Sequence, residues 1–179
     1  MLQHEGDPSR CAVILPGIRY FSQAPLLWFA REVVQAHGWS VVEVDERAPA
    51  DQEPFEWMRA QAERALEAAG SAKQVLVVGK SLGSVAATMV SGPAVWLTPL
   101  LVQDEIVAAL GSTTAPTLLA GSPADPTWAG GRVPDNPALE VLEIDGLDHS
   151  LQVSGDPLAS LDALRDVTVR VDRFVARLA

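Results

Sequence analysis

The sequence of 179 residues has one cysteine, Cys11, so no disulfide can form within the chain. A chain without disulfides suits a reducing compartment, and we therefore expect a cytoplasmic location. Cys11 opens an apolar run, which favours a small buried side chain in a strand over a catalytic thiol.

Long hydrophobic runs and clusters of positive charge are also missing. No stretch of about 18 apolar residues is present, which argues against a membrane span. Residues 1–8 have neither the basic region nor the apolar core of a secretory signal. The chain has 13 Lys and Arg against 23 Asp and Glu, a net charge of −10. Phosphate contacts need clustered cations, so we expect neither a nucleic acid nor a membrane as partner.

Apolar residues make up 48% of the chain, which is enough for the buried core of one domain. Short runs rich in Val, Ile and Leu alternate with longer segments. These runs are continuous rather than alternating with polar residues, which is typical of strands covered on both faces. The predicted strands are residues 11–15, 40–44, 75–78, 94–97, 117–120 and 139–144.

Apolar residues recur at helical spacing between these strands. The clearest patterns cover residues 26–37, 55–69 and 157–178, the last with Pro157 in its first turn. Strands that alternate with helices predict right-handed βαβ units. We therefore expect an α/β fold, a three-layer sandwich of about six mostly parallel strands with helices on both faces. A polar N-terminal arm (residues 1–10) would precede a single domain (residues 11–179).

The strand at residues 75–78 leads into Gly79-Lys80-Ser81-Leu82-Gly83 and then a segment that can be helical. A serine on such a strand–turn–helix element projects its hydroxyl at the edge of the sheet, which makes Ser81 the candidate nucleophile. The Leu82 N–H, at the start of the helix, can face a developing oxyanion. An ordinary turn that needs small residues is the alternative interpretation.

A phosphate-binding loop is a rival interpretation of Gly79-Lys80-Ser81. That motif requires a glycine five residues before the second one, with a loop between them. Position 74 is Gln74, and the residues that follow it form the predicted strand. We therefore reject this interpretation and expect Lys80 to be a solvated side chain beside the turn.

The candidate base is His149, one of three histidines. His4 lies in the polar arm, and His37 stands at a helix end, where it would complement the helix dipole. His149 follows the last predicted strand, at the sheet edge where the strand ends should gather the site. A serine hydroxyl needs such an imidazole to accept its proton.

The acid that orients the imidazole is expected between the serine and the histidine in sequence. Asp125, in the loop after the strand at residues 117–120, meets this condition. Asp145 and Asp148 compete, but a close sequence neighbour of His149 rarely reaches the far side of its ring. For the second oxyanion donor, the loop after the first strand offers the Ile18 N–H, with Gly17 as the second choice; Pro16 has no N–H.

The ordered set of Gly79-Lys80-Ser81-Leu82-Gly83, Asp125 and Asp148-His149-Ser150 resembles the α/β-hydrolase superfamily. The likeness covers most of residues 11–179 and is strongest to small members without a cap domain, similar to dienelactone hydrolases and carboxylesterases. It implies hydrolysis of a small ester, thioester or related acyl substrate through an acyl-enzyme on Ser81, with no cofactor and no metal.

The sequence departs from this family at two positions. Pro16-Gly17 replaces the usual His-Gly pair of the oxyanion loop, and Ser84 stands where glycine is frequent. We also expect the first two strands and the lid of larger members to be absent, since 179 residues leave no room for them. Short loops would then recognise the substrate, with Tyr20, Trp96 and Trp128 as candidate apolar walls; the same rings could equally pack beneath loops. A catalytically inactive binding or scaffold protein of the same fold is the alternative function. Either a monomer or a homodimer agrees with the sequence.

Overall fold

The computed structural model describes residues 1–46, 48–129 and 131–178. Within these residues, seven strands form one sheet in the order β1-β3-β2-β4-β5-β6-β7. Strand β1 is antiparallel to its neighbour and the other pairs are parallel. The strands are β1 (Leu2–His4), β2 (Asp7–Leu15), β3 (Trp39–Glu43), β4 (Gln74–Lys80), β5 (Ala94–Leu97), β6 (Thr117–Gly121) and β7 (Leu139–Glu143).

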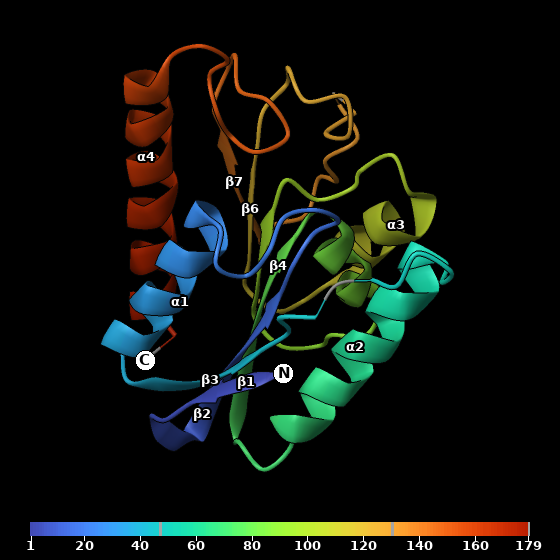
Figure 1. Ribbon diagram of the computed structural model, residues 1–179, viewed down its shortest axis with the longest axis vertical. Coiled ribbons are helices and arrows are strands. Elements are labelled where there is room, and N and C mark those ends of the chain that lie inside the picture. The colour runs from blue at the N-terminus through green and yellow to red at the C-terminus, as the bar shows by residue number, and fades with distance from the viewer. Residues whose placement is uncertain (47, 130, 179) are drawn as a thin grey trace.

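Helices cover both faces of this sheet (Figure 1). Helices α1 (Pro25–Ala36) and α4 (Pro157–Ala176) pack together on one face, and α2 (Pro54–Ala68) and α3 (Asp104–Ser112) lie on the other. The predicted three-layer α/β sandwich is confirmed, and the described residues contain no cap domain. Two helix starts are capped by acidic side chains, because Glu53 and Asp156 accept hydrogen bonds from the first free N–H groups of α2 and α4.

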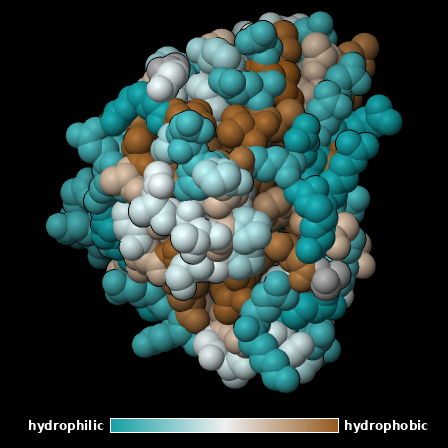
Figure 2. Space-filling view, turned by 180° about the vertical axis from the view of Figure 1, so that it is seen from behind, coloured by the Kyte–Doolittle hydropathy of each residue, from teal (hydrophilic) through white to brown (hydrophobic). Residues whose placement is uncertain are grey.

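The continuous apolar run of β2 follows from burial on both sides. Cys11, Val13 and Leu15 pack into the core beneath α2 and α3. Ala12 and Ile14 alternate with them and pack into the core beneath α1 and α4. On the outside, hydrophobic side chains reach the surface as separate areas among hydrophilic ones (Figure 2). Within the described residues, no helix is both long and apolar enough to span a bilayer.

The structure corrects three details of the prediction. Residues 1–10, expected as an arm, supply β1 and the start of β2. His4 anchors this segment, because its Nε2 lies 3.0 Å from the buried Glu43 carboxylate. The segment after Ser81 is a 3₁₀ helix, η1 (Ser81–Thr88), and α3 was not predicted.

The strand order reverses between β2 and β4, which lie side by side at the centre of the sheet. The chain moves outward from β2 to β3, then returns across β2 to form β4. Open parallel sheets bind ligands outside the carboxyl ends of their strands at such a reversal. The loop at Gly17 and the turn at Ser81 both lie there, and a Cβ built on Gly17 would stand 3.1 Å from Ser81 Cβ.

Close packing at Gly83 supports a stability prediction. A Cβ at this position would lie 2.7 Å from the main-chain oxygen of Leu15, which cannot move without distorting β2. We expect Gly83→Ala to lower the free energy of unfolding by about 1–3 kcal/mol, measured by urea denaturation. The matched control is Gly111→Ala in α3, where the nearest atom would be 3.6 Å away. The control should raise stability by about 0.5–1 kcal/mol, because alanine suits a helix better. Equal stability of Gly83→Ala and wild type would contradict the prediction.

Candidate active site

Ser81 occupies the turn between β4 and η1, with a φ of 52°. This left-handed conformation is uncommon for a residue with a side chain and is held here by close packing on both sides. A Cβ on Gly79 would lie 2.6 Å from the Trp96 ring, and Gly83 is equally tight against Leu15. The two glycines therefore allow the turn that carries Ser81 to the edge of the sheet.

Ser84 braces this turn rather than crowding it. Its hydroxyl donates to the main-chain oxygen of Ser81 at 2.6 Å and accepts from the Leu100 N–H at 3.1 Å. The side chain thus links the Ser81 turn to the loop after β5. The departure from the frequent glycine adds hydrogen bonds that glycine cannot make.

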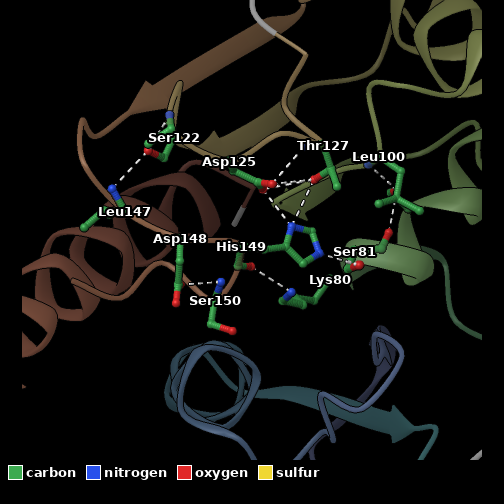
Figure 3. Close-up of polar contacts among 12 residues, drawn as sticks. Lys80, Ser81, Leu100, Ser122, Asp125, Thr127, Leu147, Asp148, His149 and Ser150 are labelled. Carbon is green, nitrogen blue, oxygen red and sulfur yellow. Dashed lines mark hydrogen bonds and ion pairs between the residues drawn. The ribbon is translucent and has the colours of Figure 1, made fainter. Parts of the chain in front are cut away.

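Ser81, His149 and Asp125 lie in one hydrogen-bonded chain (Figure 3). His149 Nε2 is 2.7 Å from Ser81 Oγ, and His149 Nδ1 is 2.7 Å from Asp125 Oδ2. The Asp125 side chain is fully buried, whereas the imidazole is about one-third exposed. In this arrangement the carboxylate fixes the tautomer with the proton on Nδ1, which leaves Nε2 free to accept the serine proton. The structure thus brings together the three residues that the sequence predicted.

Asp148, the competing acid, has a different position. Its Oδ1 accepts the N–H groups of Ser150 and Gln152, at 2.7 and 3.0 Å. It therefore shapes the turn that carries His149 instead of binding the imidazole. Ser122 also fixes this turn. Its Oγ accepts a hydrogen bond from the Leu147 N–H at 3.1 Å and so connects the loops after β6 and β7.

Thr127 is a site residue that the sequence analysis missed. Its hydroxyl lies 2.9 and 3.0 Å from the two Asp125 carboxylate oxygens and 2.9 Å from His149 Nδ1. Its N–H also donates to Asp125 Oδ1, at 2.9 Å. The sequence did hold a signal, since an Asp followed two residues later by Thr favours a turn closed by the carboxylate.

The loop after β2 and the start of η1 border a cavity of about 350 Å³. Ile18 and Leu82, the predicted oxyanion donors, both line it. The Gly17 N–H already donates to the Tyr20 main-chain oxygen at 3.1 Å. This bond favours Ile18 over Gly17 as the second donor, and both oxyanion roles stay predictions.

Known structures of similar shape identify the fold. Alpha/beta hydrolase domain-containing protein 10 from mouse superposes with a TM-score of 0.73 over 99% of this chain and 94% of its own, at 12% identity. The chain has an α/β-hydrolase fold. Est1E from Butyrivibrio proteoclasticus, solved with ferulic acid bound, gives a TM-score of 0.70 at 13% identity, over 98% of this chain and 93% of its own. Esterase Pf2001 from Pyrococcus furiosus gives a TM-score of 0.68 at 13% identity, over 98% of this chain and 91% of its own. No protein-family model and no curated protein matches the sequence.

The α/β-hydrolase core contains two of the three aromatic rings predicted as substrate walls. Trp96 is 2% exposed and packs over Gly79, while Trp128 is 1% exposed and packs against Gly121. The Trp128 Nε1–H also donates to Glu143, at 2.8 Å. The prediction is wrong for these rings, because Gly79 of β4 and Gly121 of β6 leave room for them inside the fold. Tyr20 instead borders a second cavity, of about 500 Å³, between the starts of α1 and α4.

Lys80 is also placed differently from the prediction. It is 2% exposed rather than solvated. Burial lowers its pKa to about 8, although the negative charges of Asp125 and Asp148 act in the opposite direction. Its ammonium therefore lies within the site, close to the carboxylate that orients His149.

The Thr127 hydroxyl supports a prediction about rate. We expect Thr127→Val, which keeps the shape and removes the hydroxyl, to lower kcat/KM for an activated ester by roughly ten- to hundredfold, because a hydrogen bond to a charged group is lost. Thr168→Val in α4 is the control, since its hydroxyl donates to Leu164 of the same helix. Steady-state kinetics and thermal unfolding of both variants would test this. An unchanged kcat/KM in Thr127→Val would remove Thr127 from the catalytic arrangement.

Proposed function

We propose that the protein is a serine hydrolase that cleaves a small ester, thioester or related acyl compound through an acyl-enzyme on Ser81. One observation carries the proposal: two 2.7 Å contacts connect Ser81, His149 and Asp125 in the order needed for proton transfer. An inactive binding protein of the same fold would be favoured by a His149–Ser81 separation beyond about 4 Å. The observed distance does not favour it.

The reaction follows from these contacts. As Ser81 Oγ attacks the substrate carbonyl carbon, its proton passes to His149 Nε2, and the buried Asp125 carboxylate stabilises the imidazolium. The carbonyl oxygen becomes an oxyanion that the N–H groups of Leu82 and Ile18 would hold. When the C–O or C–S bond breaks, His149 returns the proton to the leaving group. His149 then takes a proton from water, which attacks the acyl-Ser81 ester. As the acyl C–Oγ bond breaks, His149 returns this proton to Ser81 Oγ, and the acid is released.

The similar structures support the coarser part of this proposal. Esterase Pf2001 and Est1E, which was solved with ferulic acid, share the fold over nearly the whole chain. Their low identity to this chain means that the substrate must be argued from its own residues.

The cavity beside Ser81 supports an apolar acyl group. Its walls include the side chains of Val44, Ala48, Trp57 and Leu82, and its volume of about 350 Å³ is at the small end for ligand sites. Asp45 and Glu46 add carboxylates to its lining. Arg19 lines the same cavity, so two carboxylates face one guanidinium, and the remaining negative charge would favour a neutral acyl group over an anionic one.

Labelling with a fluorophosphonate tests the nucleophile directly, because this reagent phosphonylates an activated serine. We expect wild-type protein to be labelled at Ser81 and Ser81→Ala to remain unlabelled, as read by intact-mass spectrometry. Ser112→Ala is the control, since this exposed serine lies at the end of α3. Absence of labelling in folded wild-type protein, or labelling that persists in Ser81→Ala, would contradict the proposal.

A series of p-nitrophenyl esters tests the acyl cavity. We expect kcat/KM to be highest for short or medium chains and at least about tenfold lower for palmitate, which the cavity cannot enclose. Ala48→Phe, which fills part of the cavity, should move the preference toward shorter chains. Ala60→Phe on the exposed face of α2 is the control and should leave the preference unchanged. A profile that Ala48→Phe does not alter would place the acyl group elsewhere.

A further inference from the structure

Lys80 makes contacts that tie the turn of the nucleophile to the loop of the base. Its ammonium donates a hydrogen bond to the main-chain oxygen of His149, at 2.9 Å (Figure 3). It also lies 4.7 Å from the centre of the Tyr20 ring, in the loop after β2. The side chain therefore spans the three chain segments that meet at the site.

The burial of Lys80 is costly for the fold. Transfer of an ammonium from water into a protein interior is strongly unfavourable unless hydrogen bonds and opposite charges compensate for it. Among the described residues, the ammonium makes one hydrogen bond and lies over one aromatic ring, with Asp125 and Asp148 acting at longer range. An apolar side chain of similar length would fill the space without this cost. A buried charge that does not help the fold points to a role in the site.

We propose that Lys80 is a positioning residue, which fastens the main chain of His149 to the strand that carries Ser81 and so keeps the imidazole within hydrogen-bond distance of the nucleophile. This inference rests on the proposed function. Because Lys80 precedes Ser81 directly, its backbone moves with the nucleophile. The hydrogen bond to the His149 carbonyl then fixes the base relative to the same turn. A small displacement of such a group can lower the rate of reaction about a hundredfold.

The protonation of Lys80 gives this role a dependence on pH. The ionisable groups that face the ammonium in the described part of the chain are Tyr20, Asp125, Asp148 and His149. As pH rises through about 8, the ammonium loses its charge, and both the hydrogen bond and the ring contact weaken. Catalytic rate should therefore fall in this range.

Stability should change in the opposite direction over the same range. The pKa of Lys80 is about 8 in the folded protein, below its ordinary value of 10.5. Between these values the unfolded chain binds more protons than the folded one at this residue, so its contribution to stability increases with pH. A rate that falls while this contribution rises is not expected of a residue with a purely structural role.

Lys80→Met provides the test, because methionine has a similar length and no charge. The matched control is Lys73→Met, which removes the other lysine of the chain at an exposed position before β4. The quantities to compare among wild type and both variants are the rate constant for fluorophosphonate labelling, kcat and KM for an activated ester, and Tm. For Lys80→Met we expect labelling and kcat at least about tenfold slower, KM within about twofold, and Tm equal to or above that of wild type. Lys73→Met should match wild type in all of these quantities.

The pH profile separates positioning from other effects. Wild type should lose rate above about pH 8, and Lys80→Met should lack this alkaline decrease. If Lys80→Met does not fold, Lys80→Arg replaces it; a guanidinium keeps its charge, so its profile should stay flat to higher pH. Rates of the variant within twofold of wild type, or a Tm that falls together with the rate, would overturn the inference alone. Wild type that fluorophosphonate does not label would overturn the proposed function and this inference with it.

Discussion

The left-handed turn at Ser81 is the constraint on which the rest of the site depends. A φ of 52° at a residue with a side chain is unfavourable, and the structure maintains it by close packing rather than by local preference. Gly79 lies against the Trp96 ring and Gly83 against the main chain of β2. The same two contacts that press β4 and η1 into the core leave the serine hydroxyl at the edge of the sheet. Packing of the fold and the position of Ser81 at the sheet edge therefore have one cause.

The other members of the site reach Ser81 from loops, and each loop is fixed by short polar contacts. Asp148 closes the turn that carries His149, Ser122 ties that turn to the loop after β6, and Thr127 holds the Asp125 carboxylate. Loops alone would place an imidazole too loosely for proton transfer. Hydrogen bonds between loops supply the rigidity that the strand ends supply for Ser81. These contacts explain how loops can hold the arrangement at the edge of the sheet.

The sequence predicted those parts of the structure that depend on local pattern. Continuous apolar runs identified the six parallel strands, and the order of Ser81, Asp125 and His149 identified the hydrogen-bonded chain. Residues 1–10 were missed because β1 is polar and forms by pairing with β3, a contact distant in sequence. Trp96 and Trp128 were misplaced for a related reason. Trp96 fits inside because Gly79 lies in the neighbouring strand β4, and Trp128 because its loop folds back over Gly121 of β6; local pattern reveals neither contact.

The burial of Lys80 could have been predicted from the alternation of side chains along β4, although not from its residue type. Leu76 and Val78 point toward the core beneath α1 and α4, whereas Val77 points toward the opposite core. Continuation of this alternation through β4 puts Lys80 on the same face as Leu76 and Val78, where solvent is excluded. A charged residue type suggested solvation, but its position in the strand required burial. Since a buried ammonium needs an acceptor, it donates to the main-chain oxygen of His149. The sheet thus directs the side chain before Ser81 toward the loop that carries His149.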